Sequence, residues 1–99
     1  MIAVIGSFRL PPLRVAEALP MMREVIEATL QESGCRAYSY AEDVAEAGLF
    51  RVMEMWDSRE ALDAHFATPH MRQWTAQRDA LGFSDRRISL FPLGVGEEL

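Results

Sequence analysis

The chain has 99 residues, the size of one small domain, so we expect a single domain over residues 1–99. Hydrophobic residues make up 49% of it and charged residues 25%, which is typical of a globular protein and not of a disordered one. Ten basic and fifteen acidic residues give a formal net charge of −5. This balance argues against nucleic-acid and anionic-membrane surfaces, because both need concentrated positive charge.

Two further features bear on the compartment. No stretch approaches the roughly 18 apolar residues of a membrane helix, and the apolar opening over residues 1–5 is too short for a signal-peptide core. The single cysteine, Cys35, excludes an internal disulfide and fits a reducing compartment. We therefore expect a cytoplasmic protein without membrane association.

The first half of the chain predicts a strand, a helix and a hairpin. An apolar run over residues 1–10 is typical of a strand, and Pro12 can begin the helix. Apolar residues three and four apart predict the buried face of a helix that ends at Gly34: Val15, Leu19, Met22, Ile26 and Leu30. Pro20 should bend this helix or split off its first turn. Residues 35–42 and 49–56 then predict two antiparallel strands joined by a short loop.

The second half predicts a helix broken in two and a last strand. Residues 57–60 resemble a capping box, and a short helix continues from them to Phe66. Thr68 and Pro69 then predict the start of a further helix that ends at Gly82. Residues 86–93 predict the last strand. The order β-α-β-β-α-β indicates an α+β, ferredoxin-like fold with a four-stranded antiparallel sheet.

Both faces of the predicted strands are apolar. In the first strand Ile2, Val4 and Phe8 alternate with Met1, Ala3 and Ile5, and the later strands repeat this pattern. A monomer does not leave a large apolar sheet face in water. We therefore expect two copies to pack these faces together as a symmetric homodimer. The alternative is a tail or loop folded over the second face.

Two histidines and a strand carboxylate are the candidates for chemistry. His65, at the edge of a helix's apolar face, can act as a base near neutral pH, or it can be a hydrogen-bonded structural histidine. His70 lies in a first helical turn, where a structural role is favoured. The two histidines are five residues apart and would need Glu54 or Cys35 as a third ligand, so we expect no metal.

Glu54 shares a strand face with Phe50, Val52 and Trp56. A carboxylate in such surroundings should pair with an arginine or have a raised pKa. It could fix a salt bridge, or it could orient a substrate hydroxyl or accept its proton. The methionine-rich and aromatic interior, including Tyr38 and Trp74, suits an adaptable pocket for a flat apolar ligand.

Three segments together resemble the antibiotic biosynthesis monooxygenase family. They are residues 32–38 (ESGCRAY), 50–56 (FRVMEMW) and 61–70 (ALDAHFATPH). The shared marks are a Gly-Cys-x-x-Tyr strand entry, a Glu-x-Trp strand end and a helix that ends in His-x-x-x-Pro-His. The resemblance covers nearly the whole chain, and the combination is more specific than any one of the marks.

This resemblance implies a dimeric α+β barrel that oxidises an aromatic quinol, phenol or polyketide with O₂ and no cofactor. In such a protein His65 would be the base or hydrogen-bonding group. Trp56 and Tyr38 would shape the cavity, and Glu54 would orient one of these two side chains. The residues that would contact the substrate are Trp56, Tyr38, His70, Trp74 and Phe66. Two alternatives remain open: a non-catalytic dimer that binds a small apolar ligand, and a polyketide cyclase or lactone isomerase.

Overall fold

A computed structural model describes all of residues 1–99 and shows one four-stranded antiparallel sheet in the order β2-β3-β1-β4. The strands are β1 (Ile2–Arg9), β2 (Cys35–Glu42), β3 (Leu49–Trp56) and β4 (Ser84–Pro92). The helical elements are a 3₁₀ turn η1 (Pro12–Arg14), α1 (Val15–Leu30), α2 (Arg59–Phe66) and α3 (Pro69–Ala80). This confirms the predicted ferredoxin-like α+β fold, including the second helix broken in two.

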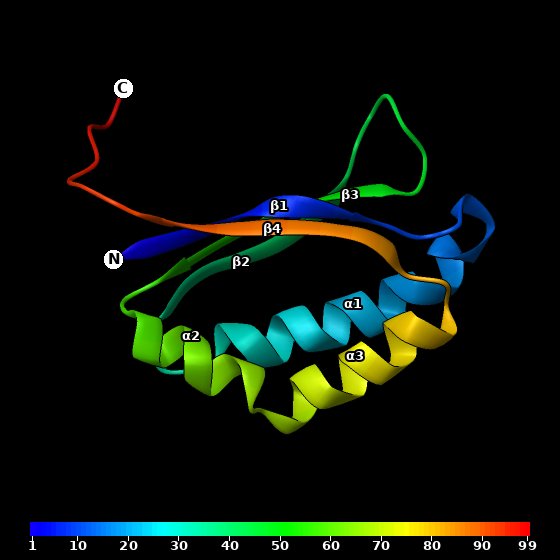
Figure 1. Cartoon of the computed structure of the whole chain (residues 1–99), viewed down its shortest axis with the longest axis horizontal. Helices are drawn as coiled ribbons and strands as arrows, with labels where there is room; N and C mark the ends of the chain where they lie inside the picture. Colours follow the sequence, from blue (N-terminus) through cyan, green and yellow to red (C-terminus); the bar gives the residue numbers. More distant parts are fainter.

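All three α-helices lie on one face of the sheet, and the other face is uncovered (Figure 1). The larger core cluster joins Phe8, Phe50 and Val52 of the sheet to Met22 of α1 and Trp74 of α3. A smaller cluster of Val4, Tyr38, Trp56 and Leu62 lies where α2 meets the sheet. None of the helices combines the length and apolar character needed to cross a bilayer.

The buried face of α1 differs from the one that the sequence predicted. Its fully buried residues are Ala18, Met22, Val25 and Thr29, whereas Leu19 and Leu30 are 38% and 45% exposed. The small side chains of Ala18 and Thr29 let the helix approach its neighbours closely, so the packed stripe is rotated away from the larger leucines. Helix α1 also continues through Pro20, which is exposed, and no separate first turn is split off there.

The connections around α2 have specific causes. The hydroxyl of Ser58 accepts a hydrogen bond from the Ala61 N–H, and that of Thr68 accepts one from the Met71 N–H. These two caps begin α2 and α3 where the sequence predicted. Gly34 has a φ of +84° and leads the chain from α1 into β2, and a Cβ there would lie 2.7 Å from that of Ala61. The turn after α1 is therefore held directly against α2.

The uncovered face of the sheet is apolar over much of its area, as the alternation predicted. Ile5 and Met53 are paired in register and are 50% and 41% exposed. Phe91 of β4 is opposite Ala3 and is 48% exposed. We call this surface, made by Met1, Ile5, Met53, Met55, Phe91 and Leu93, the open face.

Candidate functional site

Glu54 is a carboxylate buried at the centre of the sheet, on the face that the helices cover. Its strand neighbours in register are Tyr38 of β2 and Val4 of β1, and it is only 6% exposed. The indole N–H of Trp56 donates a hydrogen bond of 3.0 Å to its Oε1. Burial raises the pKa of Glu54 above its usual range, although this hydrogen bond and the charge of Arg86 oppose the rise.

No arginine forms an ion pair with Glu54 within the chain. Of the two expectations for this carboxylate, the raised pKa is thus the one that the structure shows. A buried carboxylate without a cationic partner destabilises a fold, and such groups are concentrated at functional sites.

Glu54 lines a small pocket of about 130 Å³ between α2 and the β1–β4 side of the sheet. We call it the Glu54 pocket; its other lining residues are Val4, Arg59, Leu62, Phe66, Arg86, Ile88, Ser89 and Leu90. A second hollow of about 400 Å³, here called the α3–β4 groove, lies beside it. The groove is lined by Phe66, Met71, Arg72, Thr75, Ala76, Arg78, Asp79 and Arg86.

Phe66 and Arg86 line both hollows, so the two lie next to each other, and we treat them together as the candidate site. Pockets for small molecules usually measure roughly 300–1,000 Å³ and are mostly apolar with a few polar groups. The groove meets this size, and the Glu54 pocket extends it towards the buried carboxylate. A ring bound along Phe66 could therefore present a hydroxyl group to Glu54.

Behind Glu54 lies a layer of aromatic side chains. The Tyr38 and Tyr40 hydroxyl groups are 2.7 Å apart and share a hydrogen bond. Burial raises the pKa of Tyr40 to about 12 and that of Tyr38 further, so both phenols are neutral at physiological pH. Tyr38 also meets Trp56 edge to face at 6.5 Å between ring centres. This layer forms a rigid apolar backing for the carboxylate.

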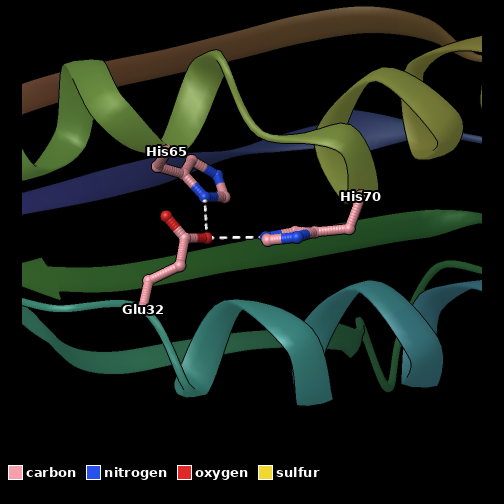
Figure 2. A group of neighbouring side chains, drawn as sticks. All are labelled: Glu32, His65 and His70. Atoms are coloured by element: carbon pink, nitrogen blue, oxygen red, sulfur yellow. Dashed lines mark hydrogen bonds and ion pairs between the residues drawn. The ribbon is translucent and has the colours of Figure 1, made fainter.

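Glu32, His65 and His70 form a second polar cluster, between the end of α1 and the segments α2 and α3 (Figure 2). The Oε2 atom of Glu32 lies 2.7 Å from Nδ1 of His65 and 2.7 Å from Nε2 of His70. The three come from the turn after α1, the end of α2 and the start of α3. Gly34 and the Thr68 cap set the positions of these segments, and so bring the three side chains together.

The hydrogen bonds of this cluster define the tautomer of His65. Burial lowers the pKa of His65, while the carboxylate of Glu32 opposes the change, so the ring is neutral at pH 7. A neutral ring that hydrogen-bonds a carboxylate through Nδ1 carries its proton there, which leaves Nε2 as the acceptor. His65 is 1% exposed and packs against Trp56 and Tyr38, with ring centres 4.9 and 5.3 Å apart.

The same cluster is the part of the chain whose residue types could bind a metal ion. Its three ligand-type atoms lie within 4.8 Å of one another, and Glu32 takes the place that the sequence analysis gave to Glu54 or Cys35. Ligand atoms about 2.1 Å from a tetrahedral zinc ion would be separated by about 3.4 Å. Both N···O distances are instead 2.7 Å, the length of a charge-assisted hydrogen bond. The arrangement is that of a hydrogen-bonded carboxylate with two imidazole donors.

The structure separates the predicted site residues into three groups. Glu54 and Phe66 line the site. Trp56, Tyr38 and His65 lie buried directly behind it, and His65 lines none of the hollows. Trp74 is a core residue that is 1% exposed, and His70 is bound to Glu32 on the helix side.

Two features of the site were not predicted from the sequence. Glu32 is 33 residues from His65 and 38 from His70, so only the fold shows that it binds both. Arg78 and Arg86 were not predicted as site residues. Arg78 follows the buried Met71 and Trp74 at helical spacing on α3, and this spacing was a signal that it lies inward.

Comparison with known proteins agrees with this architecture. The family model described as antibiotic biosynthesis monooxygenase matches residues 1–77. The chain belongs to the antibiotic biosynthesis monooxygenase family. The match includes all of the Glu32 cluster, Glu54 and Phe66, but stops before Arg78 and Arg86.

Individual relatives of this family member extend over most of the chain. The crystal structure of a candidate antibiotic biosynthesis monooxygenase from Deinococcus radiodurans superposes with a TM-score of 0.92 at 26% identity, covering 100% of this chain and 98% of that one. Rv0793 of Mycobacterium tuberculosis, named as a candidate monooxygenase, is 34% identical over 76 residues, 77% of this chain and 74% of its own length. YgiN of Escherichia coli, named as a candidate quinol monooxygenase, is 29% identical over 85 residues, covering 76% and 82% of the two chains.

Proposed function

We propose that this family member is a monooxygenase that oxidises an aromatic quinol or phenol with O₂. The observation that carries the proposal is the buried carboxylate of Glu54 on the wall of a pocket that adjoins a groove of small-molecule size. Membership of the family and the names of the relatives support oxygenation as the reaction class.

The reaction balances without an external reductant when the substrate is a quinol. A base accepts one phenolic proton, and the electron-rich anion reduces O₂ by forming a ring C–O bond to a hydroperoxide. Loss of water then breaks the O–O bond and leaves a hydroxyquinone. One oxygen atom becomes bonded to a ring carbon, the other leaves as water, and the quinol supplies all of the electrons. The chain therefore has only to bind the ring, accept a proton and exclude bulk water.

In this proposal Glu54 accepts that proton, because its carboxylate lines the pocket. A carboxylate with a raised pKa is a better match to a phenol than an exposed one, because efficient bases have pKa values near the working pH. The charged groups that act on it are Arg86, which favours its ionised form, and Glu32, which disfavours that form. His65 acts as a positioning residue, since it packs against the two aromatic rings behind the carboxylate.

The functional unit that we propose is a homodimer joined through the open face. Exposed apolar side chains of β1, β3 and β4 lie on this face, and a two-fold axis would let the same surface of a second copy cover them. Two sheets packed in this way make a barrel with a helical layer on each outer side. The grooves then remain on the helix side of each sheet.

Oxygen uptake tests the proposed reaction. Reduced 1,4-naphthoquinone should consume O₂ faster with the purified protein than in buffer without it. The product should gain one oxygen atom from ¹⁸O₂. Glu54→Gln should lower the enzymatic rate by about 10²-fold or more, the usual effect of losing a general base. Glu27→Gln, which changes an exposed carboxylate on α1, is the matched control.

Uptake no faster than in buffer, with naphthoquinols and with anthrones, would contradict the oxygenase proposal. An isomerase or cyclase is the second candidate, because a buried carboxylate at a pocket can also exchange protons with a substrate carbon. It would yield a product of unchanged mass.

A further inference from the structure

Three arginines that have no acidic partner converge on the α3–β4 groove. Five of the chain's ten arginines form ion pairs with carboxylates: Arg9, Arg14, Arg36, Arg51 and Arg59. Among the other five, Arg72, Arg78 and Arg86 all line the groove. Asp79 is the one acidic residue of its lining, and it forms an ion pair with none of them. The local charge is thus positive in a chain whose net charge is −5.

The surroundings of Arg78 in the groove disfavour its charged side chain. Its guanidinium group lies 4.4 Å above the ring of Phe83, and its Nε atom is buried without a hydrogen-bond acceptor. Burial lowers the pKa of Arg78, and the nearby positive charge of Arg86 lowers it further. Two neighbouring cations, one with an unpaired buried donor, are stabilised when an anion binds between them.

Arg86 links the proposed anion position to Glu54, because it lines both hollows. It comes from β4, lines both the groove and the Glu54 pocket, and is exposed, so it is free to turn towards a ligand. Phe66 also lines both hollows and gives them a shared apolar wall. A planar guanidinium group binds a carboxylate or phosphate through two parallel hydrogen bonds.

Building on the proposed function of this site, we propose that its substrate is an anion. The ligand is a flat aromatic ring whose carboxylate or phosphate group is bound by Arg78 and Arg86, with the ring along Phe66 and its reacting hydroxyl at Glu54. Arg72, which also donates a hydrogen bond to the Ala67 carbonyl, adds positive charge at the same groove. Neutral quinols would then still be oxidised, but with a lower kcat/KM than acidic ones.

Calorimetric titration with three unreactive probes tests this inference separately from catalysis. The probes are naphthalene-2-carboxylate, 2-naphthyl phosphate and the uncharged naphthalene-2-carboxamide. One of the two anions should bind the wild-type chain at least about tenfold more tightly than the amide, as expected for charge-assisted hydrogen bonds. The anion that binds more tightly identifies the acidic group.

Arg86→Gln should reduce this preference to less than about threefold and leave the affinity for the amide nearly unchanged. Arg87→Gln is the control, because it removes the same charge from the next residue of β4, which is opposite Ser7 and lines a different hollow. Its preference for the anion should equal that of the wild type. The proposal is wrong if neither anion binds more tightly than the amide, or if both variants lose the preference equally.

The binding result and the oxygenase assay can fail independently. Preferential binding of an anion without oxygen uptake by any acidic naphthoquinol would contradict the proposed function and leave the anion site standing. Turnover of neutral naphthoquinol with no preference for an anion would contradict the anion site and leave the proposed function standing.

Discussion

The indole N–H of Trp56 and the carboxylate of Glu54 are joined by a 3.0 Å hydrogen bond inside the protein, where both side chains are almost fully enclosed. The two residues are two apart on β3 and point to the same face of the sheet. This bond gives the carboxylate a fixed orientation while leaving its second oxygen without a hydrogen-bond donor in the chain. It therefore holds the carboxylate in one orientation at the wall of the pocket and leaves its second oxygen available for the proposed proton transfer.

The first prediction concerns the stability cost of this arrangement. Because burial raises the pKa of Glu54, the folded state favours its neutral form, and stability is lost as the pH rises above the ordinary glutamate value. Glu54→Gln keeps an acceptor for Trp56 and removes the buried charge. Its free energy of unfolding at pH 7 should exceed that of the wild type by about 1 kcal/mol. Urea titrations at pH 4 and pH 7 should show a larger difference at pH 7, and a variant that is less stable at both would contradict this account.

The second prediction concerns the pH dependence of turnover. Glu54 accepts a proton only when it is ionised, so kcat/KM for a naphthoquinol should rise with pH through the pKa of Glu54. The midpoint should lie above the usual glutamate value of about 4.3, since burial raises the pKa. Initial rates corrected for uncatalysed oxidation give this profile. Persistence of the same rising limb in Glu54→Gln would assign it to another group.

The third prediction separates the two roles of Trp56. Trp56→Ala removes a side chain that is fully buried, so it should lower the free energy of unfolding by about 3–5 kcal/mol. Trp56→Phe keeps much of the packing but loses the N–H donor that lowers the pKa of Glu54. The rising limb of kcat/KM should therefore move to higher pH in Trp56→Phe. An unchanged limb would mean that the hydrogen bond does not tune the carboxylate.

The fourth prediction tests the cluster on the helix side. Glu32→Ala removes the acceptor shared by His65 and His70 and leaves the buried Nδ1–H of His65 unpaired. We expect a loss of about 2–3 kcal/mol in the free energy of unfolding, the cost of an unsatisfied buried donor. The exposed Glu27→Ala should change it by less than about 0.5 kcal/mol. NMR titration of the His65 ring should also show a lower pKa in Glu32→Ala, because Glu32 raises the pKa of His65.

The sequence predicted local features of the chain well and contacts between distant elements less well. Periodicity and turn residues located every strand, the Ser58 and Thr68 caps and the apolar second face, because each depends on neighbouring residues. The predicted buried stripe of α1 was right for Met22 and wrong for Leu19, since the choice between Leu19 and Ala18 depends on how closely a helix approaches the sheet. Spacing alone also could not show that Glu32 joins the two histidines.

The fifth prediction concerns the open face, on which the proposed homodimer depends. Ile5 is 50% exposed near the middle of this face, opposite Met53 on β3. Ile5→Glu would place a charge from each copy in an apolar interface, and buried unpaired charges are strongly disfavoured. Sedimentation velocity should show a dimer for the wild type and mainly a monomer for Ile5→Glu at micromolar concentration. Leu13→Glu is the control, because Leu13 is 96% exposed on η1, away from the sheet. A wild-type chain that sediments as a monomer, with Ile5→Glu indistinguishable from it, would show that the open face is not closed by a second copy.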